Sequence, residues 1–364
     1  MSVLYLQPLA PSVFTDKGDM AWAIPEYSLA EVDEAGIVLA KSKSDRLDVP
    51  LLLALSTINN FRSSHNFPLN TFQIGLRRRA KQIDANSLVA QRIKRLPSIR
   101  HKLRIMQKWI TLSQMQDIGG CRAVLGSVAS VNNLVEDYKE SDIKHKLEKL
   151  HDYIKTPKPT GYRSVHLVYR YNSDRSKTYN GLRIEIQVRS ILQHAWATAV
   201  ETVGLFTQQA LKSRQGQKEW LRFFALMGSA LAQRERQPLV PGTPIDKAEL
   251  TKEIRACAAS LDVVNHLHAF SQALQVTENP GPQKAHYFLL QLDPVAKEVK
   301  VFGYPQHELL KASADYEEAE RSGSGSGIDA VLVSVESLAS LKRAYPNYFL
   351  DTGVFIQAVE SAIA

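Results

Sequence analysis

The sequence predicts an α+β fold in which helices flank a β-sheet core. Residues 182–189 alternate apolar and polar side chains, which is the repeat of a strand with one buried face. Other segments, such as 50–61, place apolar residues three or four positions apart, as an amphipathic helix does. Of the 364 residues, 44% are hydrophobic and 23% are charged, which is the composition of an ordinary globular protein.

Helices are predicted wherever apolar residues recur at the helical spacing. These segments are 50–61, 72–85, 131–150, 191–235 (one or two helices), 248–274, 307–320 and the tail from Gly353. Ser98 is a suitable N-cap and precedes Ile99 and Leu103, which predicts a further helix starting there. Lys102 would then lie in the first turn, where the helix dipole favours anions. Residues 1–45 are predicted to be irregular or to contain a strand.

Strands are predicted from alternating and β-branched segments. They are 121–125, 162–171, 182–189, a hairpin of 286–292 with 298–302, and 329–335. A loop rich in proline and glycine at 157–161 precedes the second of these, because proline fits neither a helix interior nor a central strand. Prolines and a glycine at 238–244 mark a linker, and the Ser/Gly run at 322–327 is a flexible linker by composition.

Positive charge is concentrated between Arg77 and Lys108. This stretch holds eleven lysines and arginines and a single acid, Asp84, in a chain of net charge +8. A solvated helix face would normally mix charges of both signs. One-signed density favours a polyanionic partner, either a nucleotide phosphate or a nucleic acid, and a plain solvated basic face is the alternative.

The cysteines and the N-terminal residues indicate in which cellular compartment the protein is expected. Only Cys121 and Cys257 occur, outside any Cys/His cluster, so we expect neither a disulfide framework nor a zinc site. No apolar run approaches the roughly 20 residues of a membrane-spanning helix. Residues 1–25 lack the basic start and apolar core of a secretion signal. We therefore expect a cytoplasmic protein without a membrane partner.

Two clusters of polar residues occur in the sequence up to the start of the predicted strand at 121–125. Arg92 and Lys94, with Lys102 eight residues later, can bind an anion or form a solvated face. Asp117 and Arg122 flank the pair Gly119-Gly120. Glycines let the backbone approach a ligand closely, although a plain turn with a capping aspartate is the alternative.

Further candidate residues follow in the proline-stiffened loop and the strand after it. Lys158 can bind a phosphate, Tyr162 can stack on a nucleobase, and His166 lies on one face of the next strand. In 182–189 the polar face carries two cations, a carboxylate and an amide in one row. Its carboxylate, Glu185, and Asp117 can together hold Mg²⁺. Glu185 can also take the proton of an attacking hydroxyl.

In this order and spacing, these motifs resemble the synthetase domain of the RelA/SpoT alarmone synthetases. The resemblance covers roughly residues 50–205 and is carried by RIK…SIRHK, QDIGGCR, DYIKTPKPTGYRSVHL and RIEIQVRSILQHAWA. Enzymes of that family transfer pyrophosphate from ATP to a ribose 3′-hydroxyl. Their fold has a mixed β-sheet core. No hydrolase module of the kind that family carries precedes residue 77 in this sequence.

The resemblance implies a role for each matching residue. Arg92 and Arg122 would sandwich the adenine of ATP, and Lys94 and Lys102 would bind its phosphates. Asp117 and Glu185 would bind Mg²⁺ as the cofactor, with Glu185 as the base. The acceptor side would be lined by Lys158, Tyr162, His166 and Gln187, with Tyr162 stacking on the acceptor's base. The family usually has Asn where this chain has Thr160, which puts guanine selectivity in doubt.

The layout of the chain further resembles the fused toxin–antitoxin synthetases called CapRel. In these a toxic synthetase precedes a zinc-finger-like domain without cysteines, and a Tyr-x-x-Tyr motif occupies the adenine site. This chain has Tyr345-Pro-Asn-Tyr348, although two such tyrosines are often core residues. The predicted domains are a synthetase at 1–236, a helical linker at 237–279, and at 280–364 a small α/β zinc-finger-like domain lacking metal ligands, with a terminal helix.

CapRel-type enzymes imply an acceptor, a partner and a mode of control. They pyrophosphorylate the 3′-CCA end of tRNA and so block translation, and a phage capsid protein relieves their autoinhibition. The alternatives are an alarmone synthetase that uses GDP, GTP or an adenine nucleotide as acceptor, and an inactive nucleic-acid-binding regulator that keeps the fold. The sequence names neither the acceptor nor the oligomeric state.

Overall fold

The computed structural model describes residues 22–42, 48–106, 109–210, 217–272, 274–279, 285–293, 295–323, 328–349 and 351–364. Its helices are α1 (Leu29–Lys41), α2 (Val49–Ser64), α3 (Asn66–Ile83), α4 (Leu96–Met106), α5 (Val128–Glu140), α6 (Ile191–Ala210), α7 (Gln217–Glu235), α8 (Lys247–Ser260), α9 (Val263–Gln272), α10 (Leu309–Ser322), α11 (Leu338–Ala344) and α12 (Gly353–Ile363). Short 3₁₀ turns are η1 (Lys177–Tyr179), η2 (Gln306–Glu308) and η3 (Pro346–Tyr348).

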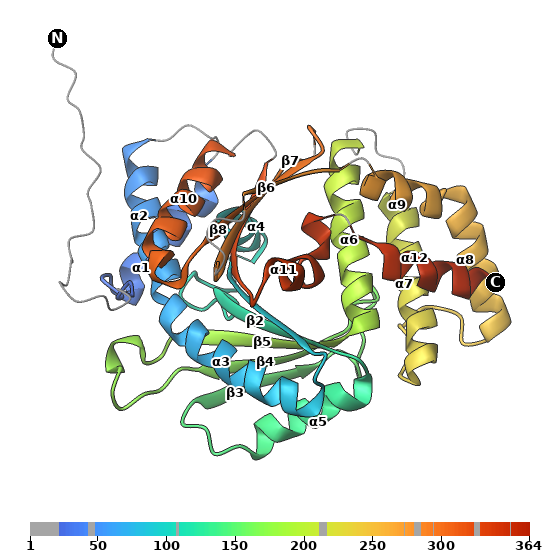
Figure 1. Ribbon diagram of the computed structural model, residues 1–364, viewed down its shortest axis with the longest axis horizontal. Helices are drawn as coiled ribbons and strands as arrows, with labels where there is room; N and C mark the ends of the chain where they lie inside the picture. Colours follow the sequence, from blue (N-terminus) through green and yellow to red (C-terminus); the bar gives the residue numbers. More distant parts are fainter. Residues whose placement is uncertain are drawn as a thin grey trace, which may run out of the picture.

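The strands of the described residues form one mixed sheet (Figure 1). They are β1 (Leu88–Ile93), β2 (Gly119–Leu125), β3 (Lys146–Asp152), β4 (Val165–Arg170), β5 (Arg183–Ser190), β6 (Gln275–Asn279), β7 (Tyr287–Asp293), β8 (Glu298–Tyr304) and β9 (Asp329–Ser334). Their spatial order is β3-β4-β5-β2-β1-β9-β7-β8-β6. The strands β2 and β5 are parallel, whereas β1 pairs with β2 and β4 with β5 in antiparallel fashion.

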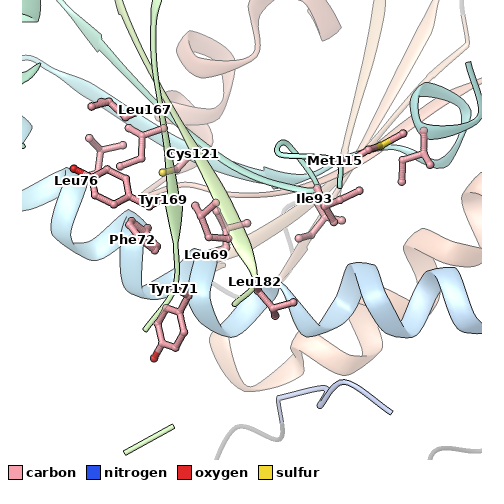
Figure 2. Packing of buried hydrophobic residues seen from close by; sticks show 14 of the residues in the cluster. Leu69, Phe72, Leu76, Ile93, Met115, Cys121, Leu167, Tyr169, Tyr171 and Leu182 are labelled. Atoms are coloured by element: carbon pink, nitrogen blue, oxygen red, sulfur yellow. The ribbon is translucent and has the colours of Figure 1, made fainter. Parts of the chain in front are cut away.

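One face of the central strands is covered by α3 and α5 and forms the main core. Leu69, Phe72 and Leu76 of α3 pack there against Cys121 of β2 and Leu167 of β4 (Figure 2). The three α3 residues recur at positions three and four apart, so one stripe of the helix is buried. Because alternate strand residues share a face, the opposite face of β2, β4 and β5 is left for polar side chains.

The remaining apolar clusters involve the second half of the chain. Helices α6, α7, α8, α9 and α12 pack together beside the sheet. Helix α10 covers one face of β7 and β9. On the other face, residues of β7, β8 and β9 join Leu88, Ala90 and Val124 in a cluster that includes Tyr345 and Tyr348. The C-terminal strands thus extend the sheet through β1 and β9, which pair over two residues only, Gln91 with Ser334 and Arg92 with Val333.

The expectation of an irregular or strand-containing N-terminus is wrong within its described part. Residues 29–41 form α1, which starts with a capping box. The Ser28 hydroxyl accepts a hydrogen bond from the Glu31 N–H, and the Glu31 carboxylate accepts one from the Ser28 N–H at 2.8 Å. The Ser-x-x-Glu pattern was the signal for this helix. Residues 1–21 and 43–47 lie outside the described residues.

Other predicted elements are corrected in their extent. The predicted helix 131–150 ends at Glu140, and β3 follows because Lys146–Asp152 pairs with β4. The helix α4 begins at Leu96 rather than Ser98, which places Lys102 beyond the first turn. The predicted helix 248–274 is broken between α8 and α9, where Asp262 has φ 45°. Strands β1 and β6 were not predicted from the sequence.

The predicted α+β fold with helices around a mixed sheet is confirmed. The hairpin of β7 and β8 and the strand β9 are also found where expected. The division of the chain at 236 and 279, and the zinc-finger-like character of its last part, stay predictions. None of the helices in the described ranges is both long and apolar enough to cross a bilayer.

Candidate active site

The polar face of the central strands forms the floor of the candidate site. The apolar residues of β5 are fully buried in the core, so its polar residues face the other side. The pairing registers set Glu185 beside Gly120 of β2, and Gly120 beside Arg92 of β1. One step along, Gln187 lies beside Arg122. Residues far apart in sequence therefore share one patch of the sheet. For the residues of β5, the alternation in 182–189 predicts this shared face.

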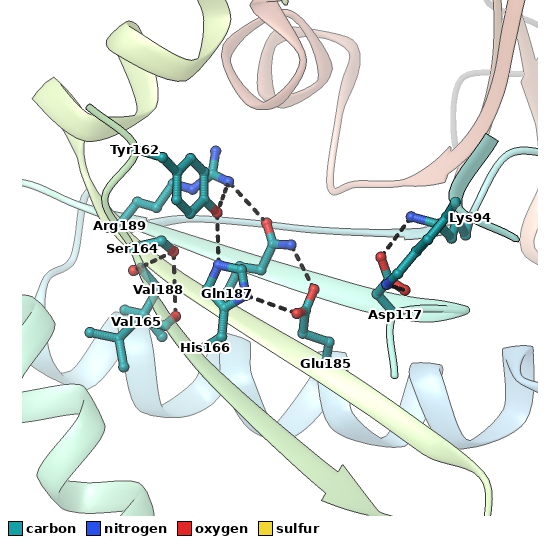
Figure 3. A network of polar contacts seen from close by, with 11 residues as sticks. Lys94, Asp117, Tyr162, Ser164, Val165, His166, Glu185, Gln187, Val188 and Arg189 are labelled. Carbon is teal, nitrogen blue, oxygen red and sulfur yellow. Dashed lines mark hydrogen bonds and ion pairs between the residues drawn. The ribbon is translucent and has the colours of Figure 1, made fainter. Parts of the chain in front are cut away.

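Asp117 precedes β2 by two residues and is held by two lysines (Figure 3). The Lys94 ammonium donates to Oδ2 at 2.6 Å and the Lys102 ammonium donates to Oδ1 at 2.9 Å. Burial raises the pKa of Asp117, but the two ammonium groups outweigh burial and lower it to about 2. The carboxylate is therefore ionised at neutral pH.

Glu185 is held from two sides (Figure 3). Nδ1 of His166 lies 2.8 Å from Oε1, and the Gln187 amide donates to Oε2 at 2.7 Å. Burial raises the pKa of Glu185, while the hydrogen bond and charge of His166 lower it, and the net direction is down. The charge of Asp117 acts in the opposite sense on the same carboxyl group. The two acids are thus electrostatic neighbours, and both are ionised.

Glu185 belongs to a ring of hydrogen bonds that joins five side chains. The Tyr162 hydroxyl lies 2.7 Å from Nε2 of His166 and accepts a hydrogen bond from Arg189 at 2.8 Å. Arg189 also donates to the Gln187 side-chain oxygen at 3.2 Å. Burial raises the pKa of Tyr162, but Arg189 and His166 lower it overall. Arg189 is one of the two cations in the polar row of 182–189, to which the sequence assigned no function. Its alternation with the apolar residues was the signal that placed it on this face.

A group of arginines lies on the same face toward β1. Burial lowers the pKa of Arg122 to about 10, and the nearby charges of Arg189 and Arg92 act in the same direction. Among the described residues, Nε of Arg122 has no hydrogen-bond acceptor. Burial raises the pKa of the Tyr345 hydroxyl, and the charges of Arg92 and Arg122 oppose that rise. These cations lie close together, with Glu201 as an anion whose charge also acts on Arg122, and the cluster of positive charge favours an anionic or π-rich ligand.

The two C-terminal tyrosines lie over this end of the site. Tyr345 and Tyr348 are 3% and 1% exposed. The Tyr345 hydroxyl donates to the backbone oxygen of Gln91 in β1 at 3.1 Å. The Tyr348 hydroxyl accepts a hydrogen bond from Arg95 at 3.1 Å and donates to Asp329 at 3.2 Å. Arg95 and Asp329 also form an ion pair, so these two side chains fix Tyr348 in place.

The loop between β3 and β4 borders the other end of the site. The Lys158 ammonium lies 4.2 Å from the ring centroid of Tyr153 and 5.4 Å from that of Tyr162. Gly161 in this loop has φ 94°, and a Cβ atom there would lie 2.7 Å from the backbone oxygen of Phe224 in α7. Only glycine fits this position, so the loop is fixed against α7.

The donors present suit a magnesium ion. Mg²⁺ prefers oxygen ligands and is usually held by one or two carboxylates together with substrate phosphates. Asp117 and Glu185 are two ionised carboxylates, and each oxygen that accepts one hydrogen bond keeps a further lone pair. In the part of the chain that the structure describes, no group of three or more His, Cys, Asp and Glu side chains is placed to hold a metal. Phosphate oxygens would have to complete the coordination.

The structure brings together most of the residues that the sequence singled out. On one face of the sheet and its adjoining loops lie Arg92, Lys94, Lys102, Asp117, Arg122, His166, Glu185 and Gln187. Lys158 and Tyr162 border this group, and Tyr345 and Tyr348 lie over β1. The Tyr162 hydroxyl is tied to His166 and Arg189, a contact that sequence reasoning did not anticipate.

This arrangement suits a phosphorylated ligand that carries a metal ion, and the chain is similar to known proteins in the part that holds the site. Residues 91–206 match the family model described as "Region found in RelA / SpoT proteins". The match starts in β1, ends in α6 and contains Asp117 and Glu185. It supports the resemblance to the RelA/SpoT family.

Two curated proteins of Bacillus subtilis (strain 168) are similar to the same part of the chain. GTP pyrophosphokinase YwaC is 33% identical over 111 residues, which are 29% of this chain and 52% of YwaC. GTP pyrophosphokinase YjbM is 33% identical over 113 residues, which are 30% of this chain and 52% of YjbM. The chain thus spans about half the length of the curated relatives it matches.

Solved structures overlap with about half of the chain. A GTP pyrophosphokinase family protein from Streptococcus pneumoniae is 24% identical, with a TM-score of 0.40, and covers 48% of this chain and 88% of its own. Small alarmone synthetase 1 from Bacillus subtilis, bound to its product pppGpp, is 23% identical with a TM-score of 0.40. It covers 50% of this chain and 94% of its own.

Proposed function

We propose that the chain is an ATP-dependent pyrophosphokinase that releases AMP. The observation that carries the proposal is the pair of ionised carboxylates, Asp117 and Glu185, on one sheet face with Lys94 and Lys102 on Asp117. Two acids and several cations around an open floor suit a polyphosphate and its metal ion. The RelA/SpoT region and the pyrophosphokinase relatives support the same reaction.

In the proposed reaction, Glu185 accepts the proton of a ribose 3′-hydroxyl. The freed oxygen forms a bond to the β-phosphorus of ATP, and the bond from that phosphorus to the oxygen bridging to the α-phosphorus breaks. AMP leaves with the electron pair. Lys94 and Lys102 move from Asp117 to the phosphates, and Arg92 and Arg122 flank the adenine. A magnesium ion held by Asp117 and Glu185 would offset phosphate charge.

The proposed acceptor is the 3′-CCA end of tRNA, whose modification would block aminoacylation and translation. Lys158, Tyr162, His166 and Gln187 would line the acceptor side. The basic stretch from Arg77 supports an RNA partner, because neutralised phosphates give affinity for any sequence. Thr160 in place of the usual Asn fits an acceptor other than a guanine nucleotide. The second candidate is a (p)ppGpp or (p)ppApp synthetase, which the names of the pyrophosphokinase relatives favour.

We further propose that the C-terminal segment inhibits the enzyme by occupying the adenine site. Tyr345 and Tyr348 are buried against β1, and the charges of Arg92 and Arg122 act on Tyr345. A tethered ring at millimolar effective concentration would compete with ATP. This layout supports the CapRel-like hypothesis of a toxin held off by its own C-terminal domain. In that hypothesis a phage capsid protein is the activating partner, and the activity serves anti-phage defence.

The proposal is tested by replacing Glu185 and following AMP release. We expect Glu185→Gln to lower the rate by at least 100-fold, because the amide cannot take the hydroxyl proton. The matched control is Glu136→Gln in α5, an exposed carboxylate on the opposite side of the sheet, which should keep the parental rate. Both changes are made in the intact chain and in a chain that also carries Tyr345→Ala.

The destination of the γ-phosphate label of ATP separates the candidate acceptors. Label on total tRNA supports tRNA pyrophosphorylation, and label on GDP, GTP or an adenine nucleotide supports an alarmone synthetase. Undiminished AMP release by Glu185→Gln would contradict the assignment of the base. No AMP release with any acceptor would instead favour an inactive nucleic-acid-binding regulator.

A further inference from the structure

The edge strand β3 and the turn after it present three side chains on the same face as Glu185. The register of β3 sets His151 beside His166 of β4, and His166 contacts Glu185. Lys149 lies two residues before His151 in β3 and is therefore on the same face. Tyr153 lies in the turn that follows β3, and its ring contacts His166, which places it on this face as well. Ile154, the next residue of the turn, is buried in the core. The strand β3 is the outer strand of the sheet next to β4 (Figure 1), so the polar face of the site continues to this edge.

Aromatic rings connect this edge to the acceptor side. The His151 and Tyr153 rings are parallel to within 7°, with centroids 5.7 Å apart. The Tyr153 ring makes edge-to-face contacts with the His166 and Tyr162 rings. The centroid distances are 5.3 Å to His166 and 5.9 Å to Tyr162. Both His151 and Tyr153 are partly exposed. An uninterrupted series of rings thus leads from the sheet edge to the neighbours of Glu185.

The charges along this series are mostly positive. Lys149 is exposed, and Lys155 is 70% exposed. The Lys158 ammonium lies over the Tyr153 ring at 4.2 Å, so a phosphate bound there would lie beside that ring.

The acids of the segment are already engaged. Glu148 accepts hydrogen bonds from Arg170 and Arg183. Asp152 accepts hydrogen bonds from the N–H groups of Ile154 and Lys155, both at 3.0 Å, and lies 3.7 Å from the Lys155 ammonium. These acids are thus held mainly by arginines and backbone N–H groups, and the loose, exposed ion pair of Lys155 with Asp152 can be replaced by a contact to a phosphate.

We propose that β3 and the loop after it bind the single-stranded 3′ end of an RNA acceptor. His151 and Tyr153 stack on the bases that precede the reactive terminal ribose, and Lys149, Lys155 and Lys158 contact their phosphates. Aromatic platforms within a basic groove are how proteins bind single strands without reading sequence. This inference rests on the proposed function, because it assumes that the acceptor hydroxyl reacts at Glu185.

Distance gives this surface its specificity for a polynucleotide. Neighbouring strands lie about 4.8 Å apart, so β3 lies about 10 Å from β5, which carries Glu185. A mononucleotide whose ribose is at Glu185 and whose base is beside Tyr162 does not extend to His151. Only an acceptor with nucleotides on the 5′ side of the reactive one uses the strand. The surface therefore distinguishes an RNA end from GDP or GTP.

The experiment measures binding of the full chain to two fluorescent RNA hairpins. One hairpin carries a single-stranded 3′-CCA overhang and the other is blunt. We expect the double variant His151→Ala, Tyr153→Leu to bind the overhang roughly tenfold more weakly and the blunt hairpin equally well. Tyr153→Phe should bind like the parent, because the ring and not the hydroxyl makes the contact. His307→Ala, an exposed imidazole beside α10, is the matched control.

The salt dependence of binding tests the lysines separately. For a single strand, each lost phosphate contact reduces the slope of log K against log salt by about 0.7. Lys149→Ala and Lys155→Ala should each flatten the slope for the overhang hairpin by about this amount. Lys311→Ala in α10, which is 65% exposed, should leave the slope unchanged.

The outcomes separate this inference from the proposed function. If the parent chain binds both hairpins equally, or the ring variants bind the overhang like the parent while tRNA is still labelled, the β3 surface is wrong and the enzyme assignment stands. If overhang binding depends on the rings but label from ATP reaches only free nucleotides, the surface stands and tRNA pyrophosphorylation is wrong.

Discussion

Gly119 and Gly120 are neighbours in β2 but face opposite sides of the sheet. A Cβ atom on Gly119 would lie 2.7 Å from Cδ1 of Ile184 and 3.3 Å from Cβ of His65, inside the packed core. A Cβ atom on Gly120 would have Glu185 O, at 3.9 Å, as its nearest neighbour. The first glycine is thus required by packing. The second leaves open floor between Glu185 and Arg92, where the reacting phosphates are proposed to lie.

This difference predicts opposite effects of two alanine substitutions. Gly119→Ala should lower the free energy of unfolding by about 1–2 kcal/mol through overpacking, with activity falling only as far as the folded fraction does. Gly120→Ala should keep or slightly raise the free energy of unfolding and lower AMP release at least tenfold, because its methyl group fills the floor. Urea unfolding and AMP release measure the two effects. Full activity of Gly120→Ala would contradict the location of the phosphates.

At the scale of single residues, the alternation of apolar and polar positions predicted much of the site. It placed Glu185 and Gln187 on one face, and the glycine pair marked the loop that carries Asp117. It gave no information about partners that depend on tertiary contacts. Lys94 and Lys102 pair with Asp117, and Arg189 holds Tyr162, because strands from different parts of the chain meet there.

At the scale of elements, strands with clear alternation such as β5 were predicted, whereas the capped helix α1 and the strands β1, β3 and β6 were not. The strand β3 has the charged sequence KLEKLHD, which reads as helix until its pairing with β4 is known. Charged residues are common on edge strands because they oppose further strand pairing. The strand β1 (LVAQRI) was overlooked within the basic stretch although four of its six residues are apolar, because so short an apolar run does not distinguish a strand from a helix. Both β1 and β3 form strands because they pair with strands far away in the sequence, and a local pattern does not contain this information.

The junction of α2 and α3 contains a buried histidine that should make stability depend on pH. His65 is 1% exposed, its Nδ1 lies 2.7 Å from Phe61 O, and its Cβ packs near Gly119. Burial lowers the pKa of His65 from 6.5 to about 4, so the folded protein keeps this ring neutral. Below pH 6.5 the unfolded chain binds a proton there and the folded chain does not.

The folded state should therefore lose up to about 3 kcal/mol, relative to His65→Gln, as the pH falls from 6.5 to 4. Because the variant lacks this titrating group, the difference between the two chains isolates it from the carboxyl groups that also titrate. Urea unfolding at several pH values measures the difference. Parallel stability curves for the two chains would show that His65 is not kept neutral by folding.

At the scale of the whole molecule, a narrow joint connects the two parts of the sheet. The strands β1 and β9 share only two residue pairs, but side chains reinforce the contact. Arg62 of α2 donates to the Tyr316 hydroxyl of α10 at 2.9 Å and forms an ion pair with Glu320 at 2.9 Å. A short β1–β9 pairing reinforced by polar contacts suits C-terminal strands that close over the site and can separate from it.

Closure of the C-terminal strands over the site should affect the KM of the enzyme for ATP. If Tyr345 competes with adenine and the open state is populated at about 10%, removing the ring lowers the apparent KM for ATP roughly tenfold. Tyr345→Ala should show this change in KM with kcat unchanged, because the open active site is the same in both chains.

Tyr304→Ala is the control for general loosening of the C-terminal strands. Tyr304 is buried in the same strands but beneath α10, on the face away from Tyr345, and its hydroxyl donates to Asp315 at 2.9 Å. If loosening alone activates the enzyme, Tyr304→Ala will lower KM as much as Tyr345→Ala does. If neither variant changes KM, Tyr345 is a packing residue and the closed arrangement does not limit ATP binding. A lower KM for Tyr345→Ala alone means that the tyrosine ring and adenine compete for one space beside Arg92 and Arg122.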